Sequence, residues 1–185
     1  MMVFLIHVRD PQFYALPAST RAKNGNIRIM GFPPIGIMSL SSVLKRASHE
    51  CVMFDQANPE TPNSVIIEEI QKKQPALVGL SFLSTTSYPY AKILAREIRA
   101  ANRTVKLAFG GVFVSLNAPL VKQQCPEVDF VCRGDGEQLI LDLLEHLDDP
   151  SGVESVTWAK DGQVVSNPNR KTERHLDQWP FPDRE

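Results

Sequence analysis

Residues 76–83 read ALVGLSFL, an almost continuously apolar run that carries a hydroxyl side chain, Ser81, near its end. Such a run is typical of a strand buried on both faces, as in a parallel sheet with helices on either side. Similar runs occur at 3–8, 51–55, 105–111 and 128–134. This repetition predicts a five-stranded parallel sheet.

Helical patterns fill the intervals between these runs. Apolar residues recur at helical spacing over approximately 37–48, 62–74, 88–102, 117–124 and 136–148. Right-handed crossovers then predict a doubly wound α/β fold, flavodoxin-like or Rossmann-like, with strand order 2-1-3-4-5. Sheets of this kind bind ligands at the carboxyl ends of the strands, near the switch in strand order.

The alternation of apolar runs and helical patterns ends near residue 150. The segment VTWAKDGQVV at 156–165 has a Asp-Gly turn signal at its centre and predicts a small hairpin. Residues 166–185 contain three prolines and predict an extended linker that leads away from the domain. We therefore expect an α/β domain at 1–150 and a hairpin and linker at 151–185.

Composition narrows the class of protein. A chain of 185 residues with 43% apolar residues is enough for one sizeable core. Its formal charge of -1 does not favour nucleic acid or an anionic membrane as a partner, and no apolar run reaches the roughly 20 residues of a membrane span. The three cysteines have neither disulfide nor zinc spacing, which favours the cytoplasm.

The connection after the first strand is unusually long, from about residue 9 to residue 36. Its prolines, glycines and aromatic residues suit a loop that lies across a large flat ligand, and Pro33, Pro34 and Gly36 form its last turn. An insertion without a ligand, or an oligomer contact, is the alternative.

Small residues follow three of the predicted strands. Hydroxyl side chains, Ser81, Thr85 and Thr86 among them, cluster after the third strand and can hydrogen-bond a buried polar group. Helix capping by Thr86 or Ser87 is the alternative. Further candidates for this edge are Leu83 after the third strand, Gly110 and Gly111 after the fourth, and Gly134, Gly136 and Glu137 after the fifth.

Several other chemistries find no motif in the sequence. It has no Gly-rich phosphate loop ending in Lys-Ser/Thr and no Gly-x-Gly-x-x-Gly after the first strand. The four histidines have no partner at metal-ligand spacing, so we expect no metal site and no catalytic residue in this chain.

Taken together, these segments resemble the cobalamin-binding domain at the front of cobalamin-dependent radical S-adenosylmethionine (SAM) enzymes, among them the anaerobic magnesium-protoporphyrin IX monomethyl ester cyclase. The resemblance covers nearly the whole chain. It rests on PPIGI at 33–37, VMFD at 52–55, VGLSFL at 78–83, FGGV at 109–112, VDF at 128–130 and GDGE at 134–137.

The resemblance implies where cobalamin binds. Its nucleotide tail, with the dimethylbenzimidazole base, would occupy a slot lined by Ser81, Leu83, Gly110 and Gly111, with Thr85 and Thr86 beside it. The corrin would lie over the turn at 33–36, and residues 134–137 would complete the rim. LDQWPFP at 176–182 resembles the bridge to a radical SAM domain.

One departure from related families concerns cobalt. Cobalamin domains like that of methionine synthase carry Asp-x-His-x-x-Gly after the first strand, and the histidine binds cobalt. Starting from Asp10, this chain has Gln12 and Ala15 at the corresponding positions. The resemblance therefore implies a base-off cofactor without a histidine ligand.

The chain has no Cys-x-x-x-Cys-x-x-Cys motif for a 4Fe–4S cluster. A cluster and SAM are expected only in a C-terminal radical SAM domain of the same chain, where the parent enzyme would be a methyltransferase or an oxidative cyclase. Three alternatives remain at this point: a response-regulator receiver, a flavodoxin-type FMN module, and a degenerate cobalamin-like domain that serves as a scaffold or protein-interaction module. The receiver lacks its acidic residues, and the FMN module lacks its short phosphate loop.

Overall fold

A computed structural model describes residues 1–9, 33–58, 60–172 and 175–184 of the chain. Its strands are β1 (Met2–His7), β2 (Glu50–Asp55), β3 (Leu77–Ser81), β4 (Lys106–Gly110), β5 (Phe130–Cys132), β6 (Val156–Lys160) and β7 (Gln163–Ser166). The helices are α3 (Ile35–Arg46), α4 (Asn63–Lys73), α5 (Tyr88–Ala101), α6 (Val112–Gln124) and α7 (Glu137–Glu145), with short 3-10 helices η1 (Pro150–Gly152) and η2 (Leu176–Gln178).

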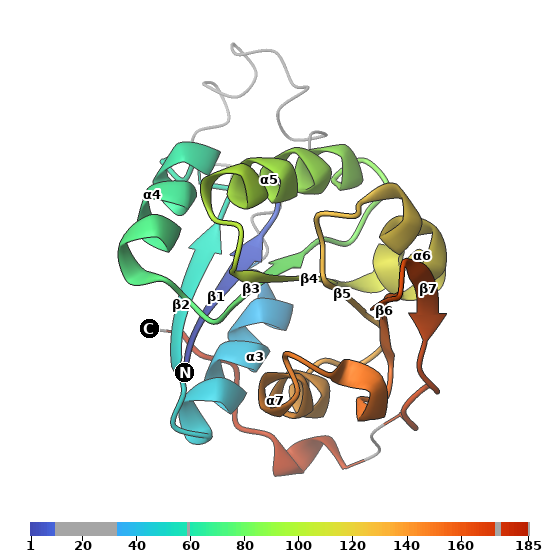
Figure 1. Ribbon diagram of the computed structural model, residues 1–185. Coiled ribbons are helices and arrows are strands. Elements are labelled where there is room, and N and C mark those ends of the chain that lie inside the picture. Colours follow the sequence, from blue (N-terminus) through green and yellow to red (C-terminus); the bar gives the residue numbers. More distant parts are fainter. Residues whose placement is uncertain (10–32, 59, 173–174, 185) are drawn as a thin grey trace.

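The strands form one mixed sheet in the order β2-β1-β3-β4-β5-β6-β7. Pairing is parallel from β2 through β5 and antiparallel at β5–β6 and β6–β7. Helices α4, α5 and α6 cover one face of the sheet, and α3 and α7 cover the other (Figure 1). The α/β fold is confirmed, whereas the prediction of a sheet with only five strands, all parallel, is wrong.

The two additional strands are the predicted hairpin, which belongs to the sheet. Val131 and Cys132 of β5 pair with Thr157 and Val156 of β6, so β5 is an inner strand. If β5 were an edge strand, a row of its backbone donors and acceptors would have no partners within the sheet. Pairing with β6 supplies those partners. The change in sequence pattern at residue 150 therefore does not mark the end of the sheet.

Asn167, directly after β7, ties the hairpin to the rest of the molecule. Its side-chain nitrogen donates to the carbonyl oxygens of Pro150 and Val153 at 2.6 and 2.8 Å. Its side-chain oxygen accepts from the indole nitrogen of Trp158 at 3.2 Å. Since Asn167 is only 7% exposed, these bonds replace its lost contacts with water.

The described chain after the hairpin turns back below α7 and α3 (Figure 1). The backbone N–H of Asp183 donates to the carbonyl of Met38 in α3 at 3.0 Å. The Asp183 carboxylate accepts from Ser41 Oγ at 2.6 Å and pairs with Lys45 Nζ at 2.6 Å. This segment packs on α3 instead of leading directly away from the domain.

One helix begins earlier than predicted. Helix α6 starts at Val112 instead of residue 117, because Gly111 makes the sharp turn out of β4 with a φ of 111°. Non-helical backbone at Asn117 and a proline at 119 interrupt the helix, which obscured its pattern in the sequence.

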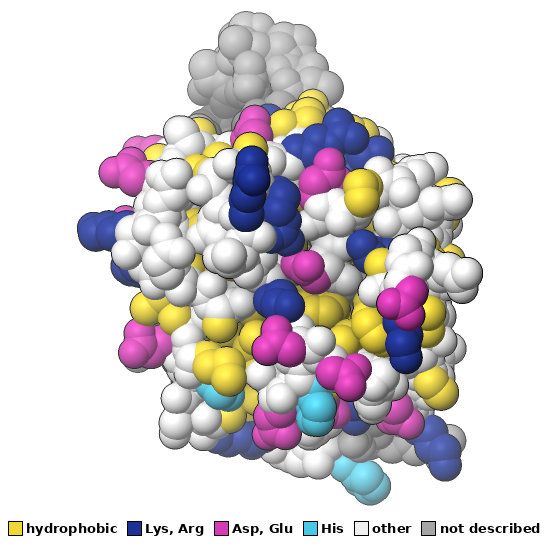
Figure 2. Space-filling model, in the orientation of Figure 1, with side chains coloured by type: hydrophobic (Ala, Val, Ile, Leu, Met, Phe, Trp, Pro, Cys, Tyr) yellow, Lys and Arg dark blue, Asp and Glu magenta, His cyan; other side chains and the backbone are white. Residues whose placement is uncertain are grey.

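The surface carries charges of both signs. On the face shown in Figure 2, basic and acidic side chains lie interspersed, with apolar side chains between them. Among the described residues, no helix has the length and apolar character that crossing a membrane requires.

Candidate functional site

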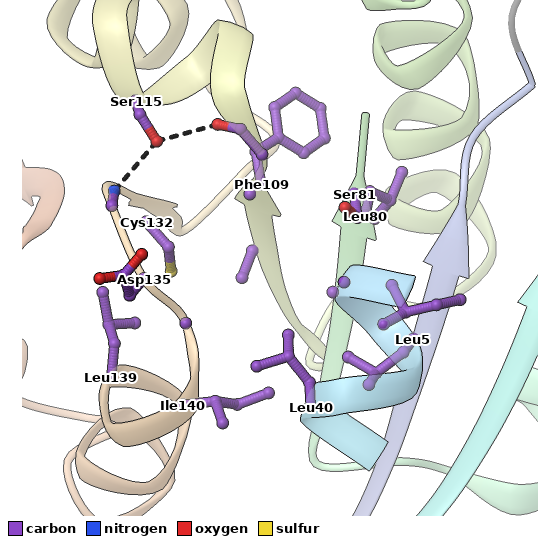
Figure 3. Close-up of a pocket in the computed structure, with 18 of the residues that line it drawn as sticks. Leu5, Leu40, Leu80, Ser81, Phe109, Ser115, Cys132, Asp135, Leu139 and Ile140 are labelled. Atoms are coloured by element: carbon purple, nitrogen blue, oxygen red, sulfur yellow. Dashed lines mark hydrogen bonds between the residues drawn. The ribbon is translucent and has the colours of Figure 1, made fainter. Parts of the chain in front are cut away.

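A cavity of about 470 Å³ lies between the sheet and the two helices α3 and α7. Leu5, Leu77 and Ala108 contribute from the sheet, while Leu40 of α3 and Ile140 of α7 point toward one another across it (Figure 3). Its rim is formed at the carboxyl ends of β3, β4 and β5. A volume of this size falls in the range of small-molecule and cofactor sites.

Alternation of side-chain size along β3 and β4 creates the cavity. On the face toward α5 and α6, the central strands carry large buried residues such as Leu80 and Phe109. On the face toward α3 and α7, they carry Gly79, Ser81 and Ala108. Because successive residues of a strand point to opposite faces, small residues at every second position leave a groove on one face only.

Gly79 and Ala108 are lining residues that the sequence reasoning missed. They are direct neighbours in the sheet, and Gly79 also pairs with Leu5. A Cβ at Gly79 would lie 3.1 Å from Leu5 Cδ2, so the strand packs closely there. The available signal is the alternation of large and small residues in VGLSF (78–82) and LAFG (107–110), which the overall apolar character of both strands obscures.

Most of the predicted site residues line the cavity. They come from the start of α3 and from the ends of β3, β4 and β5: Gly36, Ser81, Leu83, Gly110, Gly111, Gly134, Gly136 and Glu137. Residues that the sequence places far apart thus meet at one edge of the sheet, as parallel strand ends do.

The two glycines at the end of β4 have different structural roles: Gly110 is its last residue and Gly111 follows it. Space around Gly110 is open, and a Cβ there would meet no atom within 4 Å. At Gly111 a Cβ would lie 2.1 Å from the carbonyl oxygen of Phe82. Gly110 therefore leaves room in the cavity, whereas Gly111 is needed for the close approach of two strand ends.

Ser115 of α6, also missed from the sequence, joins the two loops at the rim. Its hydroxyl donates to the carbonyl of Gly111 at 2.9 Å and accepts from the backbone N–H of Gly134 at 3.0 Å (Figure 3). On the other side of the rim, Ser39 of α3 donates to Glu137 at 2.7 Å. These bonds hold the rim open in a defined shape.

Four predicted residues do not line the cavity. Pro33 and Pro34 precede α3, outside it. Thr85 is exposed, and Thr86 Oγ1 lies 2.8 Å from Ser84 Oγ. Ser84 Oγ also accepts from the backbone N–H of Ser87, so these hydroxyls bond within their own loop. Among the described residues, helix α5 has no side-chain cap, so neither Thr86 nor Ser87 caps it as the alternative expected.

Chemically, the cavity offers an apolar interior and a neutral thiol. Burial raises the pKa of Cys132 to about 12, so this lining residue carries no charge near neutral pH. Ser81 and the rim residues Asp135 and Glu137 supply the polar side chains near the opening. Such a site suits a ligand with a flat apolar part that is held by its shape.

His7 is the histidine of β1 that lies at this same edge of the sheet. Its Nδ1 is 2.9 Å from Asp55 Oδ1. Burial raises the pKa of Asp55, but the hydrogen bonds from His7 and the Ala57 backbone outweigh it, so the pKa lies below its usual value. No histidine is among the described residues that line the cavity. Asp10, Gln12 and Ala15 lie outside the described residues.

Fold and cavity define a doubly wound α/β domain with a cofactor-sized groove at its carboxyl edge. The family model of the B12 binding domain matches residues 31–144, most of the chain. The chain therefore belongs to the B12-binding domain family. This match confirms the resemblance drawn from the sequence.

Two longer proteins are similar in sequence to most of this chain. An uncharacterized methyltransferase of Pyrococcus horikoshii is 29% identical over 154 residues, which is 81% of this chain and 33% of the relative. The anaerobic magnesium-protoporphyrin IX monomethyl ester cyclase of Synechocystis sp. is 26% identical over 137 residues, 72% of this chain and 28% of the relative.

Solved structures share the fold. The cobalamin-dependent SAM radical enzyme OxsB, with aqua-cobalamin and SAM bound, superposes with a TM-score of 0.77 at 19% identity, covering 98% of this chain and 24% of that one. The radical SAM methyltransferase TsrM from Kitasatospora setae superposes with a TM-score of 0.72 at 15% identity. The match covers 90% of this chain and 30% of TsrM. This chain thus spans a third or less of the length of each relative, and its domain is similar to the cobalamin-binding domains of radical SAM enzymes.

Proposed function

We propose that this chain binds cobalamin with the lower nucleotide tail inside the cavity and the corrin over the carboxyl edge of the sheet. The observation that carries the proposal is the groove left by Gly79, Ser81, Ala108 and Gly110, which is open to the edge where the glycine-rich turns meet. A plugged groove would have favoured the scaffold alternative.

The lining residues fit such a tail. The floor and walls are apolar and match a flat aromatic base, and the open space at Gly110 and Gly134 admits the backbone of the tail between the two loops. When bound, cobalamin supplies methyl transfer or assistance to an oxidative step. The protein's part is to bind the tail, exclude water from it and orient the corrin.

The proposed state is base-off, without a histidine ligand. A base that occupies the cavity is removed from cobalt, and the imidazole of His7 is oriented by its bond to Asp55. We expect the visible spectrum of the bound cofactor to be the same in wild type and in His7→Ala. Loss of an axial nitrogen signal on that substitution, measured by electron paramagnetic resonance of the Co(II) form, would show that His7 binds cobalt.

We also propose that residues 1–150 hold the cofactor and that 151–185 connect it to a C-terminal radical SAM domain. Support comes from the relatives, which are at least three times as long as the matched region. The 4Fe–4S cluster and SAM would belong to that further domain, and the parent enzyme would be a methyltransferase or an oxidative cyclase of the cytoplasm.

The first experiment is binding of hydroxocobalamin to the 185-residue chain, followed by desalting. The wild-type protein should remain pink. Ser81→Trp should lose the colour, because an indole at this position fills the opening of the cavity. Equilibrium dialysis should then show affinity weaker by at least roughly a factor of ten.

Thr85→Trp is the matched control, since Thr85 lies in the same loop but is exposed and does not line the cavity. It should keep the colour. A colourless wild type with normal circular dichroism would favour the scaffold alternative, and equal loss in both variants would place the tail elsewhere.

A further inference from the structure

The deep part of the cavity has almost no hydrogen-bonding side chain. Leu5, Leu77 and Ala108 form its floor, and Leu40 and Ile140 are among its walls. Among the described lining residues, the polar side chains other than the Cys132 thiol lie near the rim, at the end of β3, in the loop after β5 and in the first turns of α6 and α7.

The backbone of the floor offers no replacement partners. β1, β3 and β4 are inner strands, with a hydrogen-bonded neighbour on each side. Leu5, Gly79 and Ala108 lie side by side in this ladder, so their N–H and C=O groups point toward neighbouring strands within the sheet. A ligand that enters from the face of the sheet meets only Cα and side-chain atoms there.

Two of the polar groups at the rim, Ser115 and Glu137, are engaged with the protein. The Ser115 hydroxyl already donates to Gly111 and accepts from Gly134. Glu137 accepts from Ser39. Turning the Ser115 hydroxyl toward a deeply placed amine or ring nitrogen would break bonds that shape the opening, and Glu137 lies at the start of α7, at the rim.

We propose that this cavity selects among cobamides by the polarity of the lower base, taking a benzimidazole and rejecting a purine. The inference rests on the proposed function, because it assigns the base to the cavity. Dimethylbenzimidazole has apolar methyl groups at its far edge, whereas adenine has an amine and further ring nitrogens. A buried donor without a partner weakens binding by roughly 10- to 100-fold.

The test compares the dissociation constants of cobalamin and of the cobamide with adenine as its lower base, by fluorescence quenching or calorimetry. Wild type should bind cobalamin at least roughly tenfold more tightly. The free cofactors also differ in how readily their bases leave cobalt. This property of the free cofactors is the same whichever protein variant binds them. It therefore cancels when the ratio of the two dissociation constants is compared between two variants.

Ala108→Val and Ala108→Thr are the matched pair of variants, nearly equal in volume and different by one hydroxyl at the floor of the cavity. Both reduce the space equally, so the valine variant should keep the preference for cobalamin. In the threonine variant the preference for cobalamin, measured as the ratio of the two dissociation constants, should be several-fold smaller. The reason is that the threonine hydroxyl can accept from or donate to the purine. Circular dichroism checks that both are folded.

The outcomes separate this inference from the proposed function. Equal ratios in the valine and threonine variants, with both cobamides bound by wild type, would overturn selection by polarity and leave cobalamin binding intact. Failure of wild type to bind either cobamide would overturn the proposed function itself. A wild-type preference for the adenine cobamide that the threonine variant does not alter would also contradict the inference.

Discussion

At the residue scale, Gly110 and Gly111 show how neighbouring glycines differ in what they contribute. Gly111 has a positive φ and lies against the Phe82 backbone, so only a residue without Cβ fits. Gly110 is in strand β4 and is surrounded by open space. One glycine makes the turn possible, and the other makes room for a ligand.

Alanine at each position should separate these roles. We expect Gly111→Ala to lower the free energy of unfolding by about 2 kcal/mol or more, through backbone strain and a clash with Phe82 O. Gly110→Ala should change it by less than about 1 kcal/mol, since alanine suits a strand and meets nothing. Urea denaturation monitored by circular dichroism measures both. Similar losses in the two variants would contradict the assignment.

At the scale of elements, α3 connects the cavity with the last described segment of the chain. Ile37 and Leu40 face the cavity, while Ser41 and Lys45 hold Asp183. The Asp183 carboxylate is only 8% exposed, so these contacts replace water around a buried charge. One helix therefore holds both a wall of the cavity and the last described segment.

Removing the carboxylate should release this segment. We expect Asp183→Ala to cost about 1–2 kcal/mol of stability and to speed tryptic cleavage after the exposed Lys171. Asp177→Ala, in the exposed η2 of the same segment, serves as the control and should leave both unchanged. Cleavage at the wild-type rate in the Asp183 variant would show that the other contacts of the segment suffice.

At the scale of the whole molecule, the hairpin and the cavity share one sheet. The backbone N–H of Arg133, just after β5, donates to Ser155 O at 2.9 Å, and its guanidinium donates to the Asn167 carbonyl. Since β6 covers the edge of β5, unfolding of the hairpin would expose backbone groups of the cavity domain. We infer a single cooperative unit.

Trp158 of β6 reports on this cooperativity. In a Trp179→Phe background it is the remaining tryptophan, because the chain contains two. Its fluorescence and the far-UV circular dichroism should show coincident urea transitions. An earlier fluorescence transition would mean that the hairpin unfolds independently, as a separate unit from residue 151 onward.

Much of the architecture follows from local patterns. Apolar runs such as 76–83 and the helical spacing between them predict alternating strands and helices because burial on both faces imposes that pattern. Glycines after strands mark the edge where the site lies, since only tight turns and close approaches require them. The polar cluster after β3 is harder to interpret, because hydroxyls before a helix are typical both of helix caps and of ligand contacts.

The sequence by itself determined the α/β class, the resemblance to cobalamin-binding domains and eight of the residues that line the cavity. Only the tertiary structure decided that the hairpin completes the sheet, that Thr86 bonds to Ser84, and that Gly79 and Ala108 form the floor. The physical reason is that pairing of a sheet edge and the empty volume between a sheet and two helices depend on residues distant in the chain. Local periodicity indicates to which face of the sheet a side chain points. It does not indicate whether other residues fill the space above that face.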